Sequence, residues 1–383
     1  MHFEHVIGQD FLKAHLIQSA ERGRIPHAQL FIGSHGSGVL PMAIAYAQYI
    51  LCSITKEQES ARKKACETKF SQLTHPDLHF VYPVATTDKV KSHPVSTHFA
   101  AEWREFVKNN AYGSLYEWYQ HLGIAKKQGQ IGVDEAADLV KTLSLTSYEG
   151  GYKIIIIWMA EKMNTAAANK LLKLIEEPPK NSLFLLLAEE EEQILETIKS
   201  RCQVLHFPKL SEVIIAQALI ERLGVNSDMA QHLAHQADGN YNQALHLLNK
   251  DAGDAQFEAW FIQWVRTAFQ AKGNKKAVLD LIYWSNTLAS EMRETQKNFL
   301  QFCIQFFRQA LLLNYGAEEL VYLETGDHFD LAKFAPYVHG NNIREITEEL
   351  EAAAYHIERN GNAKIILTDL SIKLTRLLHK KSA

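Results

Sequence analysis

The chain has 383 residues, of which 46% are hydrophobic and 22% are charged, and its formal net charge is −4. This composition is typical of a globular protein of two or three domains and excludes an intrinsically disordered chain. A chain with net negative charge has no global positive field, so any contact with nucleic acid must come from a local patch. We expect no membrane span, because no run approaches about 20 apolar residues, and no signal peptide at the N-terminus. The chain has four cysteines, Cys52, Cys66, Cys202 and Cys303. They are too few and too scattered for a disulfide framework, which favours a cytoplasmic protein.

Short apolar runs in the first part of the chain predict β-strands. They span residues 28–32, 78–82, 152–158, 182–188 and 203–207. Each is nearly continuously apolar, as is typical of strands buried on both faces of a parallel sheet. Helical stretches such as 133–145 and 165–175 lie between them. The second is expected to begin at an N-cap on Asn164 or Thr165 and to end before Pro178 and Pro179. The alternation predicts a parallel α/β domain over residues 1–208.

The stretch from about 85 to 127 interrupts this alternation and is rich in aromatic residues. These are Trp103, Phe106, Tyr112, Tyr116, Trp118 and Tyr119. We predict an inserted helical element in which the rings pack together. An aromatic platform for nucleic acid is the alternative, and the scarcity of nearby Lys and Arg disfavours it.

Beyond residue 208 the pattern is helical throughout. Residues 211–224, 227–239 and 240–250 predict three short helices, with Gly224 and Gly239 at helix ends, and form a small helical domain over 209–250. The rest of the chain, 251–383, is also helical. A 3.6-residue period marks its end, on Ile366, Leu370, Leu374, Leu377 and Leu378. Two aromatic-rich helices, 257–269 and 302–313, are either core or present a second face to a partner subunit.

The stretch GSHGSGVL, residues 33–40, occupies the place of a phosphate-binding loop, between an apolar strand and a helix. A working loop is G-x-x-x-x-G-K-[ST], in which Lys neutralises phosphate charge and Ser or Thr holds Mg²⁺. Gly33 and Gly38 keep the spacing and Gly36 lies between them, but Val39 stands in the place of the Lys and Leu40 in the place of the Ser or Thr. The glycine loop could still offer N–H groups to an anion, but Val39 and Leu40 supply neither charge nor metal ligand. We expect Val39 and Leu40 to help pack the loop.

The acidic residues that would hold Mg²⁺ are also missing. The apolar strand KIIIIW ends at Trp158, and Trp158 and Met159 occupy the positions where Asp and Glu are expected. Glu161 lies three residues beyond the strand, and we interpret it as a solvated carboxylate at a helix cap. The metal-binding arm of an ATPase site is therefore absent, and we expect no metal and no cofactor.

Two further positions concern the γ-phosphate of ATP. The stretch GNYNQAL, residues 239–245, has the layout G-x-x-R-x-A-L, with Asn242 in place of the arginine that senses the γ-phosphate. The stretch Ser200-Arg201-Cys202 precedes the last apolar strand. Arg201 is either an ordinary surface residue or an arginine finger that reaches a neighbour's ATP. Cys202 has no His or Asp partner at a telling position, so a reactive thiol is disfavoured.

Taken in order, several segments resemble the δ′ family of bacterial DNA polymerase III clamp-loader subunits. They are VIGQ (6–9), IPHAQLFIGSHGSG (25–38), HPDLHFVYPV (75–84), AANKLLKLIEEPP (167–179) and TIKSRCQ (197–203). The resemblance covers roughly residues 1–250, and the helical remainder is consistent with the family's collar domain. The pairing of LLKLIEEPP with SRC is the specific part.

The resemblance implies an AAA+ fold: an α/β module, a small helical lid and a helical collar. It implies a subunit that is inactive as an ATPase by itself and acts as a stator in a hetero-pentameric ring. The partners would be motor subunits of the gamma/tau type and a delta subunit. The complex would be part of the DNA polymerase III holoenzyme. Through this complex, the partners would also include the sliding clamp and primed DNA. Arg201 would act in trans on a motor subunit's ATP.

The chain departs from the family at its cysteines. Many members carry four clustered cysteines in a zinc module after the phosphate-loop helix, whereas residues 51–77 hold only Cys52 and Cys66, fourteen apart. A structural zinc site needs four ligands, and adding His75 still leaves the set short. We predict a helical segment rich in Lys and Glu without zinc, in which Cys52 is a buried small side chain that ends a helix.

Two other functions stay open on the sequence alone. One is an active AAA+ ATPase with a non-standard site. The other is a free-standing nucleic-acid-binding AAA+ relative, against which the acidic run Glu189–Glu192 and the net charge of −4 argue weakly.

Overall fold

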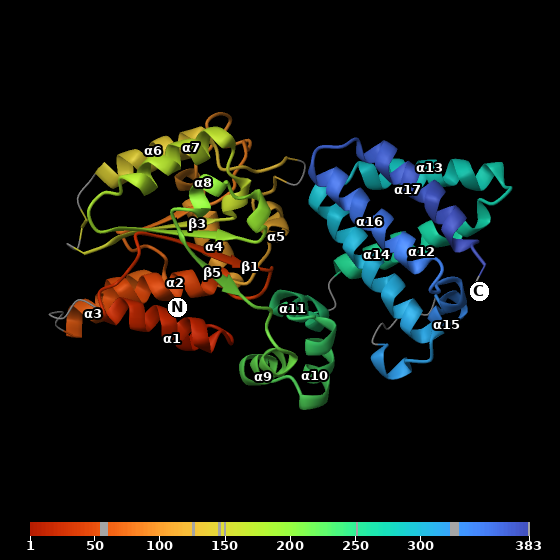
Figure 1. Cartoon of the computed structure of the whole chain (residues 1–383), viewed down its shortest axis with the longest axis horizontal. Coiled ribbons are helices and arrows are strands. Elements are labelled where there is room, and N and C mark those ends of the chain that lie inside the picture. The colour runs from red at the N-terminus through yellow and green to blue at the C-terminus, as the bar shows by residue number, and fades with distance from the viewer. Residues whose placement is uncertain are drawn as a thin grey trace. The chain divides into compact units, whose positions relative to one another are not determined.

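The structure is a computed structural model and describes residues 1–53, 60–124, 127–144, 147–148, 151–249, 252–321 and 329–381. The chain divides into two compact units, Met1–Leu248 and Asn249–Ala383, which Figure 1 shows with their helices and strands. No helix in the described ranges combines the length and the apolar character needed to cross a bilayer.

A parallel sheet of five strands is the centre of the first unit. The strands are β1 (Ala28–Gly33), β2 (Leu78–Val81), β3 (Lys153–Trp158), β4 (Ser182–Ala188) and β5 (Gln203–Phe207), in the order β2-β3-β4-β1-β5. Every residue of β3 and β4 is buried. Burial on both faces explains why these strands are apolar without alternation. The predicted strands and the parallel α/β fold are thus confirmed.

Helices cover both faces of this sheet (Figure 1). One face carries α1 (Asp10–Glu21), α2 (Val39–Cys52) and α3 (Ser60–Ser71), and the other carries α6 (Val133–Ser144) and α7 (Thr165–Glu176). Asn164 caps α7 by accepting a hydrogen bond from the Ala167 amide at 2.9 Å, which settles the open choice of N-cap. Nearly all of α2 is buried, because it packs between the sheet, α1 and the aromatic segment that follows β2.

The aromatic segment after β2 contains α4 (Ala100–Asn109) and α5 (Leu115–His121). Trp103 and Trp118 are fully buried, and Tyr82 stacks on Trp103 with 4.1 Å between ring centroids. These rings belong to the same core as α2. They are packed inside, as the favoured interpretation of the sequence predicts, and the alternative of an exposed nucleic-acid platform is wrong for Trp103 and Trp118.

Three helices follow β5 and form a small core of their own: α9 (Glu212–Leu223), α10 (Ser227–Gln236) and α11 (Tyr241–Asn249), called the lid helices below. Gly224 ends α9 in the left-handed conformation at φ 67°, as its position in the sequence predicts. Short elements elsewhere are η1 (Phe3–His5), η2 (Ser96–Phe99), η3 (Ala160–Lys162), η4 (Glu191–Gln193), α8 (Glu196–Lys199), η5 (Glu318–Leu320) and η6 (Ala335–Tyr337).

The second unit is helical. Its helices are α12 (Ala252–Gln270), α13 (Lys275–Ala289), α14 (Arg293–Asn314), α15 (Leu331–Phe334), α16 (Ile343–Glu358) and α17 (Ala363–Leu378). Trp264 of α12 stacks on Trp284 at 5.0 Å and donates a hydrogen bond to Ser371. The aromatic side chains of α12 and α14 are mostly core, whereas well-exposed apolar side chains lie on α13 and α17, with Leu279 66% and Ile365 67% exposed.

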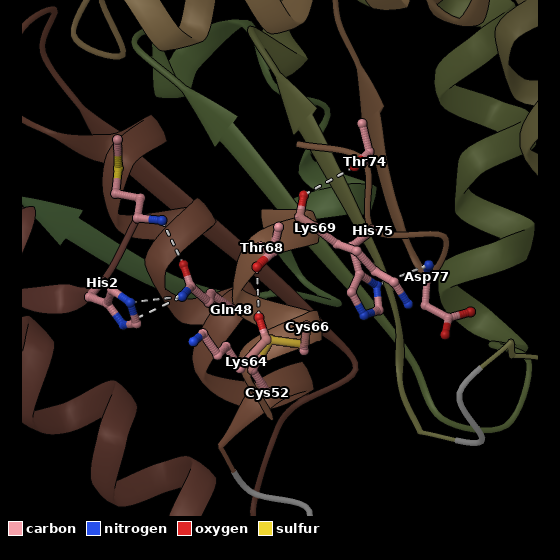
Figure 2. The surroundings of a disulfide bond; sticks show 11 residues. His2, Gln48, Cys52, Lys64, Cys66, Thr68, Lys69, Thr74, His75 and Asp77 are labelled. Atoms are coloured by element: carbon pink, nitrogen blue, oxygen red, sulfur yellow. Dashed lines mark hydrogen bonds between the residues drawn. A yellow bond between two sulfur atoms is a disulfide. The ribbon is translucent and has the colours of Figure 1, made fainter. Parts of the chain in front are cut away.

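A disulfide joins α2 to α3 in the first unit (Figure 2). Cys52 is the last residue of α2, and Cys66 lies within α3, with their Cα atoms 5.7 Å apart. From the sequence we expected no disulfide framework and did not foresee this single bond, although Cys52 is buried and ends a helix as predicted. α3 is the expected helix and is rich in Lys but carries a single Glu, Glu67; residues 54–59 of the predicted segment lie outside the described residues. Among the described residues no group of three or more His, Cys, Asp or Glu is placed to hold a metal ion.

Candidate functional site

The phosphate-loop region, residues 33–38, connects β1 to α2 at the carboxyl edge of the sheet. This edge is where parallel α/β sheets bind their ligands. Gly36 and Gly38 have φ values of 71° and 97°, a left-handed backbone that favours glycine. The loop therefore has glycines at two positions where its backbone conformation favours them.

Val39 and Leu40 begin α2 and face the protein rather than an open cleft. Leu40 is 4% exposed, and a Cβ placed on Gly33 would lie 2.6 Å from the Val39 side chain. The free space that remains beside the loop is about 40 Å³, and among its described lining residues none is Lys or Arg. Ordinary ligand pockets are roughly 300 Å³ or larger. The two residues help to fill the region beside the loop.

Trp158 and Met159 stand at the end of β3, on the same edge. The Trp158 ring lies 5.1 Å from that of Trp103 and 6.0 Å from that of Phe106, and Trp158 is only 5% exposed. Met159 is 4% exposed and has a left-handed backbone with φ 55°. An indole packed against α4 thus occupies the position at which the sequence analysis expects a metal-binding carboxylate.

Glu161 is buried, which corrects the expectation of a solvated carboxylate. It is 8% exposed, and one carboxylate oxygen accepts from the Glu189 amide at 3.4 Å, while the other has no partner among the described residues. Burial, with the nearby Glu189 charge, raises its pKa to about 7. The left-handed Met159 turns the chain so that η3 packs against the end of β4 and carries Glu161 inward.

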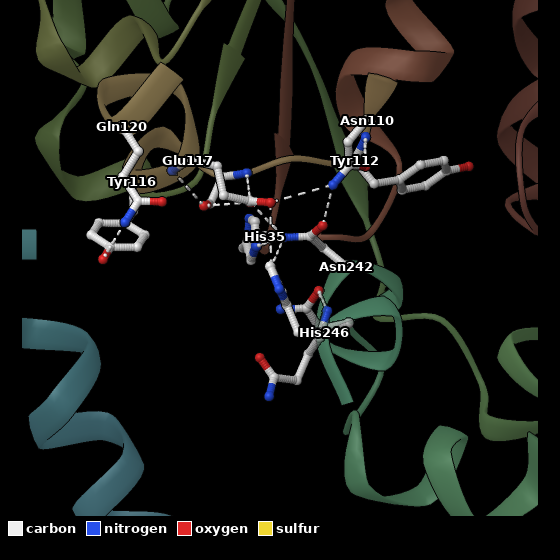
Figure 3. Close-up of polar contacts among 11 residues, drawn as sticks. His35, Asn110, Tyr112, Tyr116, Glu117, Gln120, Asn242 and His246 are labelled. Carbon is white, nitrogen blue, oxygen red and sulfur yellow. Dashed lines mark hydrogen bonds and ion pairs between the residues drawn. The ribbon is translucent and has the colours of Figure 1, made fainter. Parts of the chain in front are cut away.

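Asn242, on the lid helix α11, is the centre of a polar cluster that Figure 3 shows. Its side-chain oxygen accepts from Asn110, and its nitrogen donates to Glu117 at 2.7 Å. The same nitrogen lies 3.2 Å from the Nε2 atoms of both His35 and His246. We call these five residues the polar cluster. It joins the phosphate loop, the segment between α4 and α5, and the lid helices.

Glu117 supplies the negative charge of the polar cluster. Burial alone would raise its pKa, but hydrogen bonds from His246 and Ser114 outweigh burial and lower the pKa to about 2. The Glu117 carboxylate is 3.3 Å from His246 and accepts from the Ser114 amide at 2.6 Å. The Glu117 carboxylate is therefore ionised at neutral pH and held in place by His246 and by the Ser114 amide.

Tyr112 lies beside the polar cluster and contacts the glycine loop. Its hydroxyl accepts from the Ile7 amide at 2.8 Å, and a Cβ on Gly38 would lie 3.3 Å from its ring. The ring meets Tyr241 of the lid edge-on at 5.0 Å. Burial raises its pKa to about 12, so the phenol stays neutral.

Arg201 lies just before β5, at the opposite edge of the sheet from the phosphate loop. Because β5 runs parallel to β1 and Gln203 pairs with Gln29, residue 201 is at the amino edge, whereas Gly33 ends β1 at the carboxyl edge. The Arg201 guanidinium pairs with Glu176 at 2.7 Å, and the two side chains are 39% and 46% exposed. It also donates to the Thr197 carbonyl and to Ser200. Burial raises the pKa of Cys202 to about 11, so this cysteine is a thiol at neutral pH.

Sequence reasoning missed most of the polar cluster. Asn110 and Asn242 are 132 residues apart, and Tyr112 and Ile7 are 105 apart, so no local spacing links them. A weak signal exists in Ser114 and Glu117, which form a capping box at the start of α5. That pattern identifies a helix start and not the contact with the lid.

A five-stranded parallel sheet in this order, with a glycine loop after β1, the strand beside the edge strand β5, and lid helices after β5, defines an AAA+ module. Residues 8–211, more than half of the chain, match the family described as DNA polymerase III, delta subunit. The chain belongs to this family.

Three relatives named DNA polymerase III subunit delta' agree with this assignment. The chain is similar to DNA polymerase III subunit delta' of Bacillus subtilis, with 30% identity over 259 residues that cover 68% of this chain and 64% of that protein. It is 23% identical over 380 residues to subunit delta' of Escherichia coli, covering 96% and 94%. The chain covers 52% of the length of the relative from Haemophilus influenzae. A solved gamma subunit-related protein from Thermotoga maritima is 15% identical, with 97% of this chain and 100% of that chain covered and a TM-score of 0.43.

Proposed function

We propose that this chain is a non-hydrolysing stator subunit of a bacterial sliding-clamp loader and that it supplies Arg201 to the ATP site of a neighbouring motor subunit. Family membership and the names of the delta' relatives support the clamp-loader role. The residues of the chain support the two finer parts, which are the inactive site and the arginine finger.

The inactive site is supported by the substitutions that surround the phosphate loop. Val39 and Leu40 provide no charge for a phosphate and no ligand for Mg²⁺, and Trp158 and Met159 provide no carboxylate. Asn242, in the place of a sensing arginine, is engaged in the polar cluster. These positions therefore supply no cation and no metal ligand to stabilise charge on a transferring phosphoryl group.

The arginine finger rests on one observation: Arg201 is solvent-accessible at the edge of the sheet opposite its own phosphate loop. It therefore has no route to a phosphate in its own chain, but it can be presented to a neighbour. Its ion pair with Glu176 is exposed, and exposed pairs contribute little because water screens them. A guanidinium held so weakly can exchange the carboxylate for a phosphate, which it binds with two parallel hydrogen bonds.

The same proposal assigns the parts of the chain. Residues 1–208 form the AAA+ module with its insertion near 85–127, residues 209–250 form the lid, and residues 251–383 form the collar that assembles the ring. The partners are motor subunits of the gamma/tau type and a delta subunit in a hetero-pentameric ring. Similarity to the tau subunit of Bacillus subtilis, 25% identical over 254 residues, supports a partner of related fold. The sliding clamp and primed DNA are contacted through the complex.

The test is the ATPase rate of the complex reconstituted with motor and delta subunits and the sliding clamp on primed DNA. Arg201→Ala should leave assembly intact and reduce turnover at one site by a factor of about 10³ or more, the contribution of other arginine fingers. The total ATPase rate of the complex then falls by the fraction that this one site contributes. Lys180→Ala is the matched control, because Lys180 precedes β4 at the same edge and also carries a positive charge.

Two results would contradict the proposal. If Arg201→Ala leaves both the ATPase rate and clamp loading unchanged, Arg201 is not a finger. If the purified chain hydrolyses Mg-ATP by itself, and turnover depends on Gly38 but not on Arg201, the chain is an active ATPase with a non-standard site.

A further inference from the structure

The segment between α4 and α5, residues 110–113, lies where a P-loop module would receive a nucleotide. Ala111, Tyr112 and Gly113 line the same small space as the glycine loop and the ends of β3 and β4. The Asn110 side chain accepts from the Tyr112 amide at 3.1 Å, which holds the turn in shape. We call residues 110–117, this turn and the start of α5, the plug.

The plug contacts the N-terminal segment, the glycine loop and the lid helices. Tyr112 reaches the N-terminal segment through the Ile7 amide, the loop at Gly38, and the lid through Tyr241. Asn110 and Glu117 bind Asn242 by hydrogen bonds, and Glu117 also pairs with His246. One aromatic ring and two polar side chains therefore link elements that are distant in sequence.

The lid also rests directly on the glycine loop. The Tyr241 amide donates to the Gly36 carbonyl at 3.3 Å, and a Cβ on Gly36 would lie 1.9 Å from the Asn240 side chain. Between β5 and the lid helices, the Pro208 carbonyl accepts from the Gln9 side chain at 2.8 Å. The same side chain donates to the Ser37 carbonyl of the glycine loop at 3.1 Å. The lid helices are thus closed onto the module with no space for a ligand between them at these contacts.

Domain closure around a ligand is usual when the ligand makes contacts to both sides that the open state lacks. Here the chain itself makes those contacts. We propose that the plug is a built-in substitute for a nucleotide: it occupies the cleft and holds the lid closed in the absence of ATP or ADP. This inference goes beyond the role in a clamp loader and does not depend on Arg201.

Hydrogen exchange of the full-length chain, followed by mass spectrometry, tests the proposal. The readout is the exchange of peptides that cover residues 239–249, where the Tyr241 amide reports directly on lid closure. In the wild-type protein, saturating Mg-ADP or Mg-ATP should leave this exchange unchanged. Tyr112→Ala should speed it by about ten- to a hundredfold, the effect of losing one buried aromatic ring from the closed state. Strands β1 and β3 should stay protected.

Two milder variants separate closure from folding. Tyr112→Phe keeps the ring but loses the acceptor for the Ile7 amide, so lid exchange should rise only about two- to tenfold. Asn242→Ala removes the centre of the polar cluster from the lid side and should act like Tyr112→Ala. Tyr116→Ala is the control, because Tyr116 is an aromatic residue of the plug whose hydroxyl accepts from Gln120 on the same helix.

The proposal is overturned if nucleotide slows lid exchange in the wild-type protein, because the cleft would then admit a ligand. It is also overturned if Asn242→Ala and Tyr112→Phe both exchange like the wild type. Should Tyr112→Ala lose its fold by circular dichroism, these two variants still decide the outcome.

Discussion

Replacing Glu161 by Gln should stabilise the protein above neutral pH and change little at pH 5. Glu161 is 8% exposed, one of its carboxylate oxygens has no partner among the described residues, and Glu189 lies close by. These surroundings favour the protonated form and raise the pKa from 4.5 to about 7. Gln retains the oxygen that accepts from the Glu189 amide and carries no charge.

The sign and size follow from proton linkage. Between pH 4.5 and about 7 the folded state keeps a proton that the unfolded state has released, so the free energy of unfolding falls as the pH rises. Each pKa unit corresponds to about 1.4 kcal/mol, so the ionised Glu161 lowers stability by about 3 kcal/mol above pH 7. For a unit of this size, that difference corresponds to a rise in Tm of roughly 6–12 °C in the Gln variant.

Calorimetry of the full-length chain at pH 5 and pH 8 measures this difference. Glu192→Gln is the control, because Glu192 is exposed and its replacement changes net charge by the same amount. A Glu161→Gln variant that gains the same Tm at both pH values, or that loses stability at pH 8, would refute the reasoning from burial.

Two other predictions concern stability. The double variant Cys52→Ser with Cys66→Ser should have a free energy of unfolding about 3 kcal/mol lower, as expected for a disulfide that closes a loop with a sequence separation of 14. A reductant should lower the Tm of the wild type and leave the Tm of the double variant unchanged. Equal sensitivity of the two proteins to the reductant would contradict this. Trp158→Asp, which restores an acidic residue at the end of β3, should destabilise the chain by about 3–5 kcal/mol in thermal unfolding because it removes the contacts with Trp103 and Phe106. Trp158→Phe, which keeps an aromatic ring, should lose clearly less, and a Trp158→Asp protein of wild-type stability would show that the ring is dispensable.

The fold was largely readable from the sequence because its main signals are local. Apolar runs marked the strands of the sheet, most clearly β3 and β4, since a strand buried on both faces has no polar side to show. Glycines and prolines marked helix ends, as at Gly224 and before Pro178. The departures of Val39 and Leu40 from a phosphate-binding motif can be recognised because that motif has fixed spacing.

Other features depend on how distant segments meet. Glu161 seemed solvated because it follows a strand end, but the left-handed turn at Met159 folds it back inside. The disulfide requires Cα atoms about 6 Å apart, which the packing of α2 on α3 provides and a spacing of fourteen residues does not reveal. Tyr112 was noted only as one ring in an aromatic stretch, because its contact with Ile7 exists only in the folded chain.

The glycine loop has a consequence for how such chains are recognised. A side chain at Gly36 would meet Asn240 and the Tyr241 amide, and one at Gly38 would meet the Tyr112 ring. Both glycines are required by the protein's own packing, so selection would retain them in a lineage that had long ceased to bind ATP. A G-x-G signature is then explained by internal fit and is not by itself a sign of nucleotide use. In relatives of this chain, the identity of the residue after the last glycine is the more informative indicator of an active site.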